Sequence, residues 1–74
     1  MKIQISSGKW IDTSTITFTK IWQAFEGRGR YRRPIFEVWI ITDDGSTFSA
    51  DSFAKIEEAR DFQEFLERKI KNVD

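Results

Sequence analysis

The hydrophobic pattern of this chain changes its period once, and that change constrains the fold more than any other feature. Up to residue 50, apolar residues alternate with polar ones or gather in short runs rich in Thr, Ile, Phe and Trp, as is typical of β-strands. From residue 53 onward they recur every three or four positions, which is one stripe of an amphipathic helix. The stripe consists of Phe53, Ile56, Ala59, Phe62, Leu66, Ile70 and Val73, and Phe65 widens it. Strands followed by one helix predict an α+β fold with an antiparallel meander.

Turn and loop residues divide the first part of the chain into predicted strands. These strands cover 2–6, 9–12, 15–25, 35–42 and 46–50. Asp43-Asp44-Gly45 is typical of a tight hairpin turn with Gly45 at positive φ, and Asp51 or Ser52 can cap the helix that follows. We therefore expect an antiparallel sheet of four to five strands, either open or curled into a roll or partial barrel, with one C-terminal helix.

The length and composition exclude several classes of protein. A chain of 74 residues buries only about 63% of its unfolded surface, so residues 1–74 are expected to form a single domain with a small core. The absence of cysteine excludes a disulfide scaffold, and the absence of both cysteine and histidine excludes the usual structural zinc sites. No apolar run approaches the roughly 18 residues of a membrane span, and residues 1–5 lack the apolar stretch of a signal peptide. We expect a cytoplasmic protein without membrane contact, metal or small-molecule cofactor.

Opposite charges are concentrated in the two parts of the chain, although the net charge is zero. Residues 1–41 carry seven basic and three acidic side chains, whereas residues 42–74 carry five basic and nine acidic ones. The two parts therefore have charges of +4 and −4. A neutral chain lacks the overall charge of a polyanion-binding protein, but this separation favours self-association.

Cross-strand pairing predicts which strand residues share a face. A turn at 43–45 pairs Ile40 with Phe48, and a hairpin centred near residue 30 pairs Trp22 with Val38. The face that receives the helix then contains Ile16, Phe18, Trp22, Ala24, Phe36, Val38, Ile40 and Phe48. The other face carries Ile21, Phe25, Ile35, Trp39 and Ile41 among threonines. Lys20 falls on the helix side, which indicates a bulge that would exchange some of these positions.

We expect the large apolar residues of the second face either to be covered by another segment or chain, or to be exposed because they bind a ligand. An N-terminal hairpin carrying Ile3, Ile5, Trp10 and Ile11 would close a roll if it folded over this face. A second copy of the chain would bury the same face in a homodimer. Alternatively, the face would be a binding platform on which Trp39 and Phe25 stack against a ligand or bases.

Few residues carry the chemistry of an enzyme. Without histidine the commonest general base is missing, and no serine stands beside a lysine or carboxylate in a recognisable nucleophile elbow. Gly27-Arg28-Gly29 lacks the third glycine of a dinucleotide fingerprint and precedes a strand rather than a helix. We expect no catalytic residues and no metal ligands.

The segment 27–33 is the strongest candidate for a contact site. It places Arg28, Arg30, Arg32 and Arg33 around Tyr31, on a loop between the two longest predicted strands. Guanidinium groups pair with phosphates or carboxylates in two-point geometry, and a tyrosine can stack on a base. Three interpretations stay open: a solubilising loop that discourages aggregation, a contact with an acidic protein surface including a second copy, and a contact with nucleic acid.

Two resemblances to known families concern the same elements. Residues Ile16-Thr17-Phe18-Thr19-Lys20-Ile21, Val38-Trp39-Ile40-Ile41-Thr42-Asp43-Asp44-Gly45 and the closing helix resemble the later part of small bacterial PH-like domains. That resemblance implies strands curled into an open barrel plugged by the terminal helix. The strand order and Gly29-Arg30-Tyr31 are similar to PUR and Whirly-type repeats, which bind single strands and associate through their helices. This second resemblance implies Arg30, Tyr31 and the sheet aromatics as the binding set.

These observations predict a small non-enzymatic binding module, such as an adaptor or inhibitor, that acts through protein–protein contacts with a partner or with itself. The alternative is a single-stranded DNA- or RNA-binding protein that uses the arginine-rich loop and the sheet aromatics. The candidate binding residues are Phe25, Arg28, Arg30, Tyr31, Arg32, Arg33 and Trp39.

Overall fold

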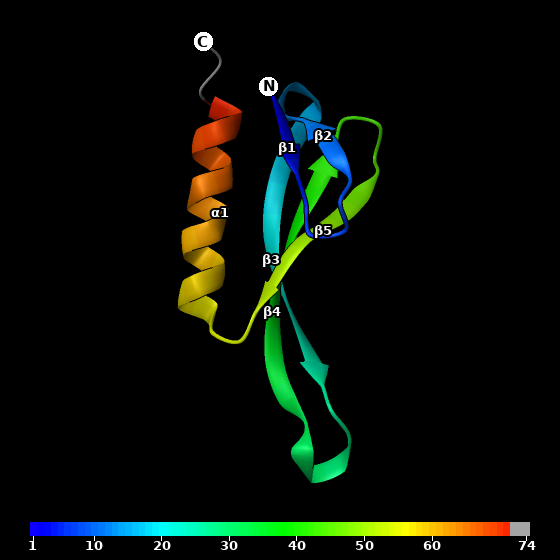
Figure 1. The fold of residues 1–74 in the computed structure, drawn as a ribbon, viewed down its shortest axis with the longest axis vertical. Coiled ribbons are helices and arrows are strands. Elements are labelled where there is room, and N and C mark those ends of the chain that lie inside the picture. The colour runs from blue at the N-terminus through cyan, green and yellow to red at the C-terminus, as the bar shows by residue number, and fades with distance from the viewer. Residues whose placement is uncertain (72–74) are drawn as a thin grey trace.

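The computed structural model describes residues 1–71, which form five strands, two short 3₁₀ helices and one α-helix (Figure 1). The strands are β1 (Lys2–Gln4), β2 (Trp10–Asp12), β3 (Ile16–Glu26), β4 (Arg33–Thr42) and β5 (Thr47–Phe53). The 3₁₀ helices η1 (Thr13–Thr15) and η2 (Gly29–Tyr31) lie in the loops on either side of β3, and α1 (Ile56–Lys71) follows β5. The α+β class, with strands first and one C-terminal helix, is confirmed.

The strands form two antiparallel sheets rather than one. β3, β4 and β5 make a three-stranded meander in the order β3-β4-β5, and β1 pairs with β2 in a sheet of its own. The predicted meander is therefore confirmed for these three strands. The described strands do not close into a barrel, so the expectation of a roll is wrong for this part of the chain.

A β-bulge near the start of β3 sets the register of the long hairpin. Ile16 pairs with Thr42, but the next pair is Phe18 with Ile41, so Thr17 is an extra residue on β3. The hydroxyl of Thr17 donates a hydrogen bond to the Ile41 carbonyl at 3.0 Å. Because side chains alternate along a strand, one extra residue exchanges the faces of everything that follows.

The bulge corrects the predicted faces of β3. Ile21, and not Trp22, lies opposite Val38, and Ile21 packs against the core. Phe18 and Trp22, predicted in the core, are 55% and 57% exposed. The inference that a bulge would exchange positions is confirmed, although the bulge lies at Thr17 rather than at Lys20.

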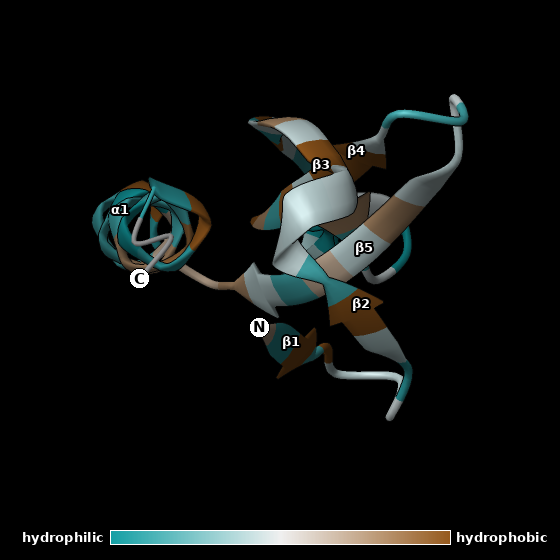
Figure 2. Ribbon diagram, turned by 90° about the horizontal axis from the view of Figure 1, so that it is seen from above, coloured by the Kyte–Doolittle hydropathy of each residue, from teal (hydrophilic) through white to brown (hydrophobic). Residues whose placement is uncertain are grey.

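The core lies between α1 and one face of the β3-β4-β5 sheet. Val38 and Ile40 of β4 are fully buried, and they form one cluster with Ala59 and Leu66 of α1. Figure 2 shows the hydrophobic side of α1 turned toward the strands and its hydrophilic side turned outward. Burial of an aliphatic side chain of this size stabilises the fold by about 1.5–3 kcal/mol, so these contacts hold the helix on this face.

The N-terminal hairpin packs into the same core instead of folding over the opposite face. Ile5 and Ile11 are 6% and 5% exposed and belong to the cluster that α1 covers. The Ser6 N–H donates to the Ala50 carbonyl at 2.9 Å, which attaches the hairpin to β5. Trp10, expected in the closed roll, is 59% exposed. The hairpin thus leaves the second face of the sheet uncovered.

α1 begins later than predicted because β5 is longer than predicted. β5 continues to Phe53, whose ring packs 5.4 Å from the ring of Phe62 on α1. Asp51 and Ser52 lie inside this strand, so the expectation that one of them caps the helix is wrong. The helix starts at Ile56.

The helical stripe is confirmed as far as the structure extends. Ala59 and Leu66 are buried, and Phe62 and Ile70 pack against the core. The last position of the predicted stripe, Val73, lies outside the described residues. Within residues 1–71, no helix is long and apolar enough to cross a membrane.

Candidate binding surface on the open sheet face

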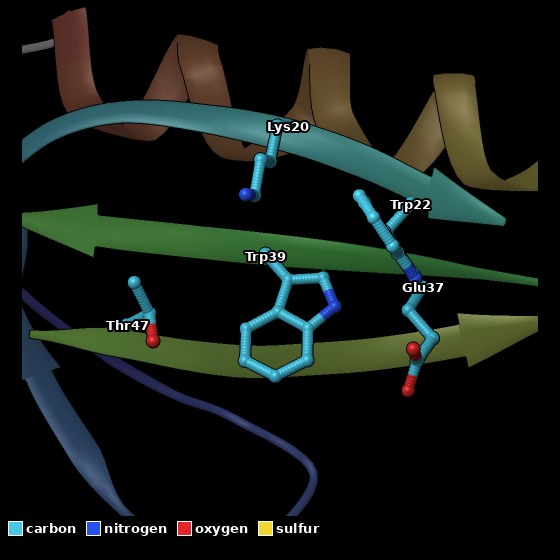
Figure 3. Close-up of a pocket in the computed structure, with 5 residues that line it drawn as sticks. All are labelled: Lys20, Trp22, Glu37, Trp39 and Thr47. Atoms are coloured by element: carbon cyan, nitrogen blue, oxygen red, sulfur yellow. The ribbon is translucent and has the colours of Figure 1, made fainter. Parts of the chain in front are cut away.

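The face of the β3-β4-β5 sheet that points away from α1 has no cover among the described residues. We call it the open face (Figure 3). It consists of Phe18, Lys20, Trp22 and Ala24 of β3, Ile35, Glu37, Trp39 and Ile41 of β4, and Thr47 and Ser49 of β5. Phe18 and Trp22 are more than half exposed, so the open face presents aromatic rings to the solvent.

Strand geometry arranges these side chains in rows. Alternate residues of a strand point to one side, and cross-strand partners lie next to each other. Along β3 and β4 the rows are Phe18–Ile41, Lys20–Trp39, Trp22–Glu37, Ala24–Ile35 and Glu26–Arg33. Each of the two rows with a tryptophan therefore combines one indole ring with one charged side chain.

A shallow depression of about 250 Å³ lies in the middle of the open face. It is lined by Lys20, Trp22, Glu37, Trp39 and Thr47. Figure 3 shows the ring of Trp39 flat against the sheet and the ring of Trp22 edge-on, so the two indoles form a floor and a wall. The Lys20 Nζ lies 5.7 Å from the centre of the Trp22 ring, which is within the range of a cation–π contact.

The indole N–H of Trp39 is buried without a hydrogen-bond partner in residues 1–71. A buried donor that lacks an acceptor costs about 1–3 kcal/mol. An acceptor supplied from outside the chain would remove this cost after a small rotation of the ring. The floor of the depression thus has a polar group that the described residues do not satisfy.

The β3–β4 hairpin extends beyond β5 and ends in a basic tip, residues 27–33 (Figure 1). Tyr31 is 79% exposed there. The Arg32 Cζ lies 4.7 Å from the centre of the Phe25 ring, and Arg33 Nε lies 3.5 Å from a Glu26 carboxylate oxygen. The structure therefore brings Phe25 together with the arginines and Tyr31.

The structure separates the predicted site residues into two groups. Phe25, Arg28, Arg30, Tyr31, Arg32 and Arg33 belong to the hairpin tip, whereas Trp39 lies on the open face. The prediction that Phe25 and Trp39 share a face is wrong. The register after the bulge turns Phe25, with Ile21, toward the helix side, and its ring is 54% exposed.

The sequence prediction missed most of the residues around Trp39. Phe18, Lys20 and Trp22 were predicted on the helix side, and Glu37 and Thr47 were not among the candidate binding residues. The signal that could have found them is Lys20, because a lysine in step with Phe18 and Trp22 marks their shared face as exposed.

The opposite end of the sheet from the basic tip carries charges of both signs. Asp43 and Asp44 form the β4–β5 turn, which we call the acidic turn, and with Lys9 and Asp12 they line a second depression of about 230 Å³ beside Trp10. The N-terminal ammonium lies 4.0 Å from Asp12. In residues 1–71, no group of three or more acidic side chains lies close enough to hold a metal ion.

Hydrogen bonds keep two of these carboxylates ionised. The Thr42 hydroxyl and the Ser46 N–H donate to Asp44, and they lower the pKa of Asp44 to about 2. The Ser14 N–H and hydroxyl donate to Asp12 and lower its pKa as well. Both carboxylates are therefore negatively charged at neutral pH.

Comparison of the chain with protein-family models, with curated proteins and with solved structures finds no match. The resemblances to PH-like domains and to PUR and Whirly-type repeats stay predictions.

Proposed function

We propose that this chain is a small, non-enzymatic protein-binding module whose contact surface is the open face. The observation that supports this most is that Phe18 and Trp22 are 55% and 57% exposed beside Trp39 on one sheet face. Contiguous apolar patches of this kind on a folded protein usually mark a binding site. Tryptophan at the centre with polar residues around it is typical of protein–protein interfaces.

The shape of the surface favours a macromolecular partner over a small molecule. The depression of about 250 Å³ is smaller than the roughly 300–1,000 Å³ of ordinary ligand sites. It lies on an open sheet rather than in a closed cleft. A broad apolar surface binds a complementary surface, and such a module acts by occupying part of its partner, as an adaptor or inhibitor does.

Photo-crosslinking from the open face tests this proposal. Lys20 is replaced by a photoreactive phenylalanine analogue in the native host, and a matched variant carries the analogue at Glu64 on α1. Both side chains are exposed, so neither substitution removes a core contact. We expect discrete protein adducts from position 20 that are at least about tenfold stronger than those from position 64. Equal or absent adducts at the two positions would contradict the proposal.

A second candidate function, binding of single-stranded nucleic acid, is favoured by the basic tip. Arg28 and Arg30 form no ion pair within residues 1–71, and Tyr31, at 79%, is the most exposed large hydrophobic side chain of that range. Free guanidinium groups beside an exposed ring fit the backbone and bases of a single strand.

The salt dependence of binding tests this second candidate. Each phosphate contact to a single strand contributes about 0.7 to the slope of log K against log salt. Replacing Arg28 and Arg30 by glutamine should therefore lower the slope by about 1.4 in a titration with mixed-sequence DNA or RNA. The control replaces Lys55 and Arg60, which removes the same charge elsewhere. An unchanged slope, or no binding at low salt, would exclude the tip as a nucleic-acid site.

A further inference from the structure

We infer that the partner of the open face is a second copy of this chain, packed face to face with its long axis reversed. The inference rests on the proposed function, because it names the partner of the same surface. It is carried by the positions of charge along the molecule and by the order of the rows on the open face.

The basic tip and the acidic turn lie far apart in a molecule whose longest dimension is 47 Å. The basic tip precedes β4, and the acidic turn with Asp43 and Asp44 follows it. β4 has ten residues, so the two charged regions are roughly 33 Å apart. In Figure 1 the tip and the β4–β5 turn lie at opposite ends of the sheet.

This separation selects one of two possible two-fold arrangements. A two-fold axis parallel to the strands would place basic tip on basic tip. An axis perpendicular to the strands reverses the second copy and places each basic tip over the acidic turn of the other. Only the second arrangement is electrostatically favourable, because like charges in contact oppose association.

The middle rows of the open face match under this operation. If the axis passes between the row Lys20–Trp39 and the row Trp22–Glu37, each row faces the other one on the second copy. The Trp39 ring then lies opposite Glu37 of the second copy, and a rotation of the ring would bring its buried, unpaired N–H to that carboxylate. Lys20 in the same way faces the Trp22 ring of the second copy, as a cation over an aromatic face.

The outer rows match by size and polarity. Phe18 faces Ala24 of the second copy, which places a large ring over a small side chain. Ile41 faces Ile35 of the second copy, so two aliphatic side chains meet. Two sheets packed face to face stand about 10 Å apart, a gap that such side chains fill from both sides.

A stable dimer needs a modest fraction of the surface of the chain. A standard interface buries about 800 Å² on each partner, which is roughly 15% of the 5453 Å² surface of the described chain. In a two-fold symmetric interface the same surface patch of each copy contacts the other copy. A single patch therefore forms both sides of the contact.

Sedimentation of the purified full chain at micromolar to millimolar concentration tests the association. We expect twice the mass of one chain at the upper end of this range. Trp22→Ala should raise the dissociation constant at least about tenfold. Phe65→Ala is the control, since Phe65 is 47% exposed but lies on α1, away from the open face, and it should leave the dissociation constant within about twofold.

Cysteine crosslinking tests the orientation, because the chain has no cysteine of its own. Arg30→Cys chains mixed with Asp43→Cys chains should form a mixed disulfide dimer several-fold faster than either variant links to itself. Preferential linking of Arg30→Cys chains to each other would overturn the reversed orientation.

Failure of this inference is distinguishable from failure of the proposed function. A single-chain mass at millimolar concentration would overturn the second copy as the partner. If photo-crosslinks from position 20 then contain a different protein, the proposed function stands with another partner. If the crosslinks from position 20 are no stronger than those from position 64, both the second copy as partner and the proposed function are wrong.

Discussion

At the scale of the residue, Asp44 is the acidic group most strongly held by its surroundings. The hydrogen bonds from Thr42 and Ser46 stabilise its ionised form and lower the pKa of Asp44 to about 2. The unfolded chain holds this carboxyl at the ordinary value near 3.9. Its contribution to stability is therefore complete above pH 4 and is lost as the pH falls toward 2.

Asp44→Asn should remove this part of the acid sensitivity. The amide oxygen can still accept from Ser46, but it does not titrate, so the variant should lose less stability between pH 4 and pH 2 than the parent chain. Urea unfolding at several pH values in this range measures the difference. Asp43→Asn is the control, because the Asp43 side chain forms no hydrogen bond in residues 1–71. Parallel curves for the parent and Asp44→Asn would contradict the assigned role.

Single residues also explain why the open face could be predicted only in part. Trp39 was placed correctly because the turn at 43–45 fixes the register of β4 against β5, with Ile40 opposite Phe48. The faces of β3 were exchanged because Lys20 indicates that a bulge exists, whereas an alternating pattern does not show that the bulge lies at Thr17. A period of two residues encodes which side chains share a face, and it does not encode which face is buried.

At the scale of the element, the helix was the most predictable part of the chain. Its stripe follows from spacing alone, and burial of Ala59 and Leu66 confirms it. Its start was predicted too early because Phe53 satisfies both a strand and a helix pattern. In the structure Phe53 pairs with Phe36 in the sheet and also packs against Phe62, so a tertiary contact decides the boundary.

Two neighbouring positions of α1 test how the helix is held. Leu66 is 2% exposed, whereas Phe65 is 47% exposed. Leu66→Ala should lower the free energy of unfolding by about 2–5 kcal/mol, because it leaves a cavity against the sheet. Phe65→Ala should lower it by less than about 1.5 kcal/mol, since the ring contacts mainly Phe62 at the rim. Chemical denaturation of both variants measures this, and equal losses would contradict the position of α1.

At the scale of the whole molecule, the separation of charge can be predicted from the sequence, but the uncovered face of the sheet cannot. The charges of +4 and −4 in the two parts of the chain are read directly from the residues. Whether the N-terminal hairpin covers the second face depends on where Ile5 and Ile11 pack. They join the core beneath α1, and no pattern in a short hairpin specifies that choice. Whether this face is covered therefore depends on how the segments pack together, and no single segment of the sequence determines it.

The central claim is that the open face is the contact surface, and the three tryptophans report on it directly. Each indole N–H gives its own signal in a nitrogen–proton NMR spectrum. In a dilution series of the full chain, we predict that the signals of Trp22 and Trp39 move more with concentration than that of Trp10, which lies off the open face. The Trp39 signal should move downfield, because its N–H gains an acceptor. Movement of Trp10 alone would contradict the account, as would three unchanged signals up to millimolar concentration.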